Sequence, residues 1–153
     1  MASIAQPRRS TPINEGISSA ILLALMLISL AGSVNAANWV DGLGLLVEAV
    51  LLGMLIGIAL AKLPLSGWLA HPLALLIALA GSLIYPLPLL VFVEGNRERV
   101  FFMLAALRDW MIKVLNGGSA SDNLIFVVQV IFFGYLFSIW ASWLIFRRHQ
   151  VWG

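Results

Sequence analysis

The chain contains no cysteine and few charged residues, and these two absences exclude several classes of protein. Without cysteine there is no disulfide framework, no thiolate metal ligand and no cysteine nucleophile. Only 10% of the 153 residues are charged, against about 25% in a typical soluble domain. Because 61% of the residues are hydrophobic, too little polar surface remains to coat a water-soluble globule. The composition therefore indicates one compact membrane domain.

The patterns that mark nucleic-acid, metal and cofactor sites are also missing. The nine lysines and arginines lie at the ends of apolar segments, whereas nucleic-acid binding needs a clustered basic face. The two imidazoles, His71 and His149, fall at segment ends, and a pigment or haem ligand would usually sit deeper. No metal-ligand spacing, phosphate loop, dinucleotide fingerprint or serine-nucleophile motif is present. The sequence thus predicts no cofactor, no metal site and no nucleic-acid partner.

Long apolar runs are the main feature that is present. They cover residues 17–34, 43–61, 72–93 and 124–146. Each run can cross the hydrocarbon core, which takes about 20 helical residues. We therefore expect an all-α integral membrane protein with four transmembrane helices over residues 17–153, preceded by a polar tail at 1–16. The first run could also be a signal peptide, but it is longer than a usual signal core, which favours an uncleaved helix.

The segment between the third and fourth runs predicts a further helix of another kind. Over about residues 100–115, apolar residues recur at three- and four-residue steps, with Arg108, Asp109 and Lys113 between them. This spacing predicts an amphipathic helix that lies in the membrane interface, packs across the ends of the spanning helices, or does both. Before it, Pro86 and Pro88 predict that regular helix ends near residue 83.

Lysine and arginine counts give an expectation for orientation. With four spans both termini share one side, which would carry five basic residues, namely Arg8, Arg9, Lys62, Arg147 and Arg148. The other side would carry four, all in the longer loop and balanced by acidic residues. Because cytoplasmic loops are enriched in lysine and arginine, we expect both termini in the cytoplasm and the amphipathic helix outside.

The second apolar run carries the clearest packing pattern. Ala49, Gly53, Gly57 and Ala61 recur at four-residue spacing, and such a stripe lets two helices approach closely. The stripe could dock another subunit, but contact with a helix of the same chain is favoured because neighbouring helices are available. Glu48 lies on the same helix, and an acid within a membrane is a candidate functional residue. We expect Gln129 to donate a hydrogen bond to Glu48, in a structural role rather than in proton transfer.

Aromatic and basic residues at the helix ends predict interface anchors, because tryptophan gathers at the membrane surface and long cations reach the head groups. The expected anchors are Trp39, Trp68, Trp140, Trp143, Arg147 and Arg148.

The last third of the chain resembles a known family. Residues 116–126, and the aromatic helix that ends in Trp143 and then Arg147 and Arg148, resemble the N-terminal membrane region of bacterial transglutaminase-like membrane proteins. Residues 38–43 and 62–71 are similar as well, so the resemblance covers most of residues 15–153. In that family a helical bundle precedes an extracytoplasmic domain with a cysteine, histidine and aspartate triad. Because this chain has no cysteine, no catalytic residue can be carried over.

These observations lead to an expected function that is not enzymatic. The resemblance implies a membrane-anchoring and helix-packing module of a transglutaminase-like protein in the bacterial plasma membrane, either as part of a longer protein or as a stand-alone relative. Its partners would be the lipid bilayer and other membrane protein subunits. The competing expectation is an accessory or structural subunit of a respiratory or photosynthetic complex, contacting partner helices, lipids or pigments. A small transporter would need a polar pathway, which one glutamate and one glutamine do not supply.

Overall fold

The structure is a computed structural model that describes residues 12–118 and 122–151, with side chains described for residues 16–118 and 122–147. All regular secondary structure in this part of the chain is helical, with five α-helices and one short 3₁₀ helix. Four of the α-helices are long and apolar enough to cross a membrane. The predicted all-α fold, with four such helices and one helix of another kind, is confirmed.

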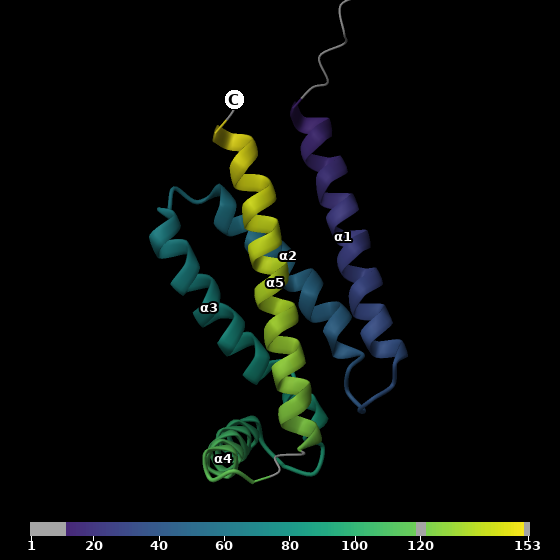
Figure 1. Cartoon of the computed structure of the whole chain (residues 1–153), viewed down its shortest axis with the longest axis vertical. Helices are drawn as coiled ribbons and strands as arrows, with labels where there is room; N and C mark the ends of the chain where they lie inside the picture. The colour runs from purple at the N-terminus through teal and green to yellow at the C-terminus, as the bar shows by residue number, and fades with distance from the viewer. Residues whose placement is uncertain (1–11, 119–121, 152–153) are drawn as a thin grey trace, which may run out of the picture.

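The elements follow one another as α1 (Pro12–Ala36), α2 (Leu45–Lys62), α3 (Gly67–Ile84), the 3₁₀ helix η1 (Leu87–Leu89), α4 (Asn96–Leu115) and α5 (Asn123–Val151). Figure 1 shows that α1 begins and α5 ends at the same end of the bundle, where α2 also turns into α3. We call this the terminal end. The opposite end carries the link between α1 and α2 together with α4, and we call it the α4 end.

The third helix begins earlier than its apolar run predicted. It starts at Gly67, so that Pro72 lies inside the helix rather than at its first residue. Trp68 and His71 therefore belong to the first turns of α3 and not to the preceding link. At the other end, α3 stops at Ile84 and gives way to η1, which contains Pro88 and follows Pro86. Proline removes a helical hydrogen bond, and this explains the irregular ending that the sequence predicted.

The core lies where α2 and α5 pack against each other, with α3 and α1 on either side. Ala49 of α2 and both Ile131 and Ile139 of α5 have essentially no exposed surface. The outer helix α1 is more peripheral, and of its side chains that the structure describes only Leu23, Leu27 and Ala31 are buried. These three recur every four residues, so α1 contacts the bundle along one stripe.

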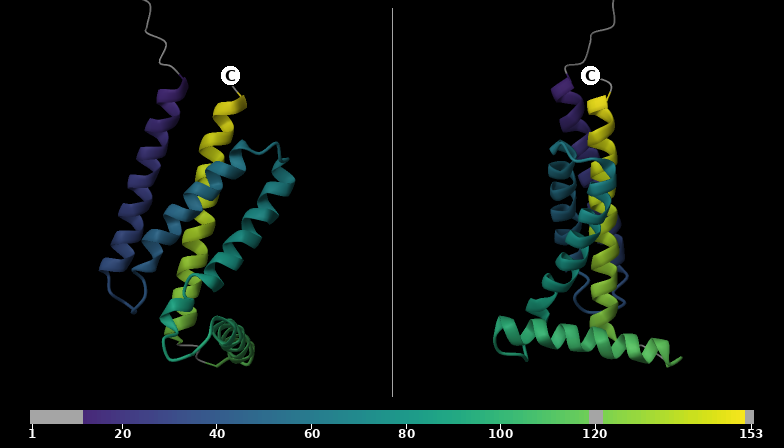
Figure 2. Two further views of the ribbon diagram at one scale, coloured as in Figure 1. Left: turned by 180° about the vertical axis from the view of Figure 1, so that it is seen from behind. Right: turned by 90° about the vertical axis from the view of Figure 1, so that its left-hand side faces the viewer.

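The fifth α-helix, α4, lies across the end of the bundle instead of along it, as Figure 2 shows. It begins one turn earlier than predicted, after Gly95, whose φ of 90° is a conformation that favours glycine. Arg99 fixes this start, because its Nε donates to the Val93 carbonyl at 2.8 Å. Met103 is the one buried residue of α4, and it packs with Leu90 and Val128.

Candidate functional site

The small-residue stripe of α2 faces α5 of the same chain. Ala49, Gly53, Gly57 and Ala61 are all buried. A Cβ atom placed on Gly57 would lie 2.5 Å from the Ile139 carbonyl oxygen and 2.7 Å from the Ser142 Cβ. One placed on Gly53 would collide with the Ser138 hydroxyl. The two glycines thus allow a close approach of the helices, and this face of α2 is already occupied within the chain.

Two serines on α5 complete this interface, and the sequence reasoning missed them. Ser138 and Ser142 have no exposed surface. Each hydroxyl donates to a carbonyl oxygen of α5 itself, Ser138 to Tyr135 at 2.8 Å and Ser142 to Ser138 at 2.7 Å. Their polar atoms are therefore satisfied without a ligand. The signal that could have found them is their four-residue spacing, which matches the spacing of the two glycines opposite.

The expected hydrogen bond between Gln129 and Glu48 is not present among the described residues. The Glu48 carboxylate instead accepts a hydrogen bond from the Tyr85 hydroxyl at 2.6 Å. Ala49 faces the core, so the neighbouring Glu48 is turned about 100° away around α2. That rotation brings Glu48 to the residue after α3, while Gln129 lies on α5 in a different environment. The pair that the structure forms ties the start of α2 to the end of α3.

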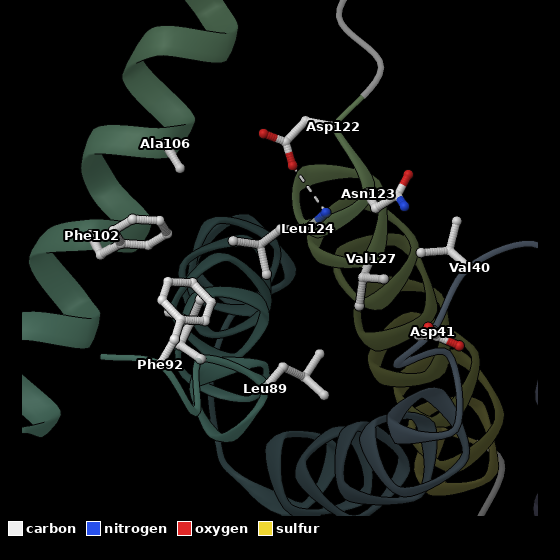
Figure 3. Close-up of a pocket in the computed structure, with 11 residues that line it drawn as sticks. Val40, Asp41, Leu89, Phe92, Phe102, Ala106, Asp122, Asn123, Leu124 and Val127 are labelled. Atoms are coloured by element: carbon white, nitrogen blue, oxygen red, sulfur yellow. Dashed lines mark hydrogen bonds between the residues drawn. The ribbon is translucent and has the colours of Figure 1, made fainter. Parts of the chain in front are cut away.

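A cavity of about 420 Å³ separates α4 from the bundle. Figure 3 shows that its lining comes from the α1–α2 link, η1 and the segment after it, α4, and the first turns of α5. Phe92 and Phe102 form one wall, with their rings 5.3 Å apart and nearly perpendicular. Leu124 and Val127 line it from α5. The cavity volume falls within the range of about 300–1,000 Å³ typical of ligand pockets.

A second cavity of about 370 Å³ adjoins the first and shares Val40, Asp122 and Asn123 with it. Trp39, Trp110 and Gln129 contribute to its lining. We call the two cavities together the α4 groove. Gln129 and Trp39, which the sequence singled out for other roles, therefore meet here. Phe92, Phe102 and Trp110 could not be identified as lining residues from the sequence, because the groove depends on how α4 is placed.

Two carboxylates belong to the α4 groove. One oxygen of Asp122 accepts from the backbone N–H groups of Leu124 at 3.0 Å and Ile125 at 3.3 Å, and so caps the start of α5. Asp41, in the α1–α2 link, is exposed and forms no hydrogen bond or ion pair with any described residue. No lysine or arginine is among the described residues that line the groove.

The expected interface anchors lie at both ends of the bundle. Trp39 at the α4 end is 68% exposed and Trp68 at the terminal end is 86% exposed, as residues that contact head groups should be. Also at the terminal end, the Arg147 guanidinium lies over the Trp143 ring, 5.1 Å from its centre. His71 packs edge-on against both Trp140 and Trp143. The side chain of Arg148 lies outside the described residues.

A third cavity, of about 360 Å³, opens on the side of the bundle between α1, α2 and α5. Its lining is almost wholly apolar and includes Leu27, Val50 and Gly134. Phe133 and Phe137 on its rim are more than half exposed. Nowhere in the described part of the chain do three histidine, aspartate or glutamate residues come together in a way that could hold a metal ion.

Comparison of the chain with protein-family models, with curated proteins and with solved structures finds no match. The relation to transglutaminase-like membrane proteins stays a prediction from the sequence.

Proposed function

We propose that this protein is a non-enzymatic membrane module that anchors in the bilayer and holds a docking surface at the α4 end. The observation that supports this most is the position of α4. It lies across the bundle end, held by the buried Met103, and it leaves an open groove with aromatic walls beside it. A helix that only filled space would pack flat against the bundle and leave no such cavity.

Each part of the module has a separate task in this proposal. The apolar faces of α1, α2, α3 and α5 insert into the membrane, and the small residues of α2 fix α5 in place. Four exposed apolar residues of α4, namely Val100, Leu104, Met111 and Leu115, lie along one side of the helix and would enter the lipid interface. The groove is then left free to receive a partner.

The resemblance noted in the sequence suggests which partner that is. In a transglutaminase-like protein of the bacterial plasma membrane, the α4 groove would contact the extramembrane domain. This requires the α4 end to face outward and both termini to lie in the cytoplasm. Because the chain has no cysteine, single-cysteine variants can test this orientation without labelling of other thiols in the chain. A cysteine in place of Lys113 should react with a membrane-impermeant maleimide on whole cells, and one in place of Leu63 should not.

Photo-crosslinking in the native cell tests the docking surface itself. A photoreactive residue at Phe102 or at Trp39 should capture the same protein, because both positions line the groove from different elements. Ile112, which is on α4 but outside the groove, is the matched control and should not capture it. An adduct with a domain that carries cysteine, histidine and aspartate supports the transglutaminase-like relation. Lipid adducts alone at both groove positions would overturn the docking proposal.

An accessory subunit of a larger membrane complex is the second candidate, and the apolar cavity beside α1 favours it. Phe133 and Phe137 are 65% and 56% exposed at its rim, in the middle of the longest span. A partner helix seated there would bury both rings. Photoreactive residues at Phe133 would then capture a subunit of an energy-converting complex, and Phe102 would not.

A further inference from the structure

The α4 groove has an unusual charge distribution for this chain. It holds the carboxylates of Asp41 and Asp122 and the amides of Asn123 and Gln129. Four of the chain's basic residues lie on α4 itself, yet none of them lines the groove. They are Arg97, Arg99, Arg108 and Lys113. The groove therefore presents negative charge to whatever occupies it.

The contacts of the α4 arginines explain why they do not neutralise the groove. Arg97 lies over the Phe101 ring at 5.6 Å, and Arg99 is bonded to the Val93 carbonyl. Arg108 faces Asp109 at 3.6 Å, where both side chains are more than half exposed. Each of these arginines makes another contact, and Asp41 and Asp122 have no cationic partner among the described residues.

Aromatic rings add a second attraction for a positive charge. Phe92 and Phe102 line the larger cavity, and Trp39, Trp110 and Phe126 line the smaller one. The face of an aromatic ring attracts cations, tryptophan most strongly, and guanidinium groups also stack on it. The groove thus combines carboxylates with aromatic rings, and no lysine or arginine is among its described lining residues. This combination favours an occupant that has an apolar body and a cationic head.

We propose that the α4 groove binds a peptide segment of the docking partner that carries arginine or lysine next to apolar residues. The inference rests on the docking function proposed above. Both chemistries occur in the larger cavity, where an apolar side chain suits the wall of Phe92 and Phe102 and a cationic side chain suits Asp41 and Asp122. The adjoining smaller cavity leaves room for the next residue of an extended segment. An ammonium lipid suits the groove less well, because its phosphate would meet the same two carboxylates.

A pair of matched peptides tests this in nanodiscs of neutral phosphatidylcholine that contain the full chain. One capped five-residue peptide has a central arginine between leucines, and the other has citrulline there, which keeps the shape and removes the charge. We expect the arginine peptide to bind at least about fivefold more tightly, since one charge near such a surface is worth about that factor. The preference should weaken as salt rises.

Substitutions of the two aspartates test whether they cause the preference for the arginine peptide over the citrulline peptide. Asp41→Asn combined with Asp122→Asn should abolish the difference between the peptides, because asparagine still caps a helix but carries no charge. Asp109→Asn, at an exposed carboxylate of α4 that lines neither cavity, is the matched control and should leave the difference intact.

The outcomes separate this inference from the docking proposal. Equal binding of both peptides to the unmodified chain overturns the cationic preference and leaves docking in place. Failure of both peptides to bind overturns docking of peptides at the groove as well. If phosphatidylethanolamine nanodiscs abolish arginine-peptide binding that phosphatidylcholine nanodiscs allow, the groove is a lipid site and the inference is wrong.

Discussion

The α2–α5 interface and the α4 end of the bundle are built from different materials. Between α2 and α5, glycines face serines, no side chain larger than serine separates Gly57 from Ser142, and the polar atoms are satisfied within α5. At the α4 end, large aromatic side chains stand around open cavities, and Met103 alone is buried from α4. The first region is closed to partners by its own packing. The second is held by a few contacts, those of Met103, Arg99 and Phe102, and stays accessible.

The comparison indicates that the α2–α5 interface stabilises the bundle and that the α4 end is the region available for recognition. Apolar surface gains little from association in lipid, so close contact of small residues must hold the spans together. At the membrane surface, water and charged groups are available, and a groove with unpaired carboxylates can be tolerated there. Changes in the interface should therefore alter the stability of the whole bundle, and changes at the α4 end should alter α4 alone.

The largest expected effect comes from filling the interface. Gly57→Leu places a side chain where even a Cβ atom meets the Ile139 backbone, which cannot move without moving α5. We expect the free energy of unfolding to fall by more than about 3 kcal/mol, the upper range for overpacked cores. Unfolding in a mixed-micelle denaturant titration measures it. Gly32→Leu on α1 is the control, because no atom lies within 4 Å of a Cβ there, and it should change stability little.

A smaller and local effect is expected at the α4 end. Met103→Ala removes the one buried contact of α4 and should weaken its docking by about 2 kcal/mol. Hydrogen exchange should accelerate in α4 while the amides of α2 and α5 stay protected. Equal acceleration in all three helices would contradict the separation of the two regions. Met111→Ala, at an exposed position on the same helix, is the matched control.

The smallest effect is expected where α2 meets the end of α3. Tyr85→Phe removes the hydroxyl that donates to Glu48, and polar contacts in membrane bundles are worth on average about 0.6 kcal/mol. The same titration should resolve a loss of about that size. Gln129→Leu should not alter the effect of Glu48→Gln, because the two residues are not bonded to each other. A strong coupling between positions 48 and 129 would restore the pairing that the sequence suggested.

The spans could be predicted because hydrophobicity and helix length are properties of a local stretch of chain. The regular helix before Tyr85 and the amphipathic character of α4 followed for the same reason. The first turns of α3 were missed because Gly67, Trp68 and His71 resemble a link in composition. Tertiary context decided that they are helical.

Contacts between helices were harder to predict, because they depend on how each helix is rotated about its axis. The spacing of Gly53 and Gly57 indicated a packing face but did not name α5 as its partner. Glu48 was assigned the wrong partner because similar depth in the membrane says nothing of direction around α2. The α4 groove could not be predicted at all, since it exists only when η1, α4, α5 and the α1–α2 link come together.

An intramolecular cross-link between α2 and α5 tests the central claim most directly. A Cβ atom on Gly53 would lie 3.4 Å from the Ser138 Cβ, close to the separation of about 3.5–4.5 Å found in disulfides. The double variant Gly53→Cys with Ser138→Cys, in a chain that has no other cysteine, should therefore form a disulfide within one chain under mild oxidation in native membranes. Gly32→Cys with Ser138→Cys should not. Disulfides between two chains, or thiols that remain free, would contradict the account, because they would place the small-residue face of α2 against another subunit or away from α5.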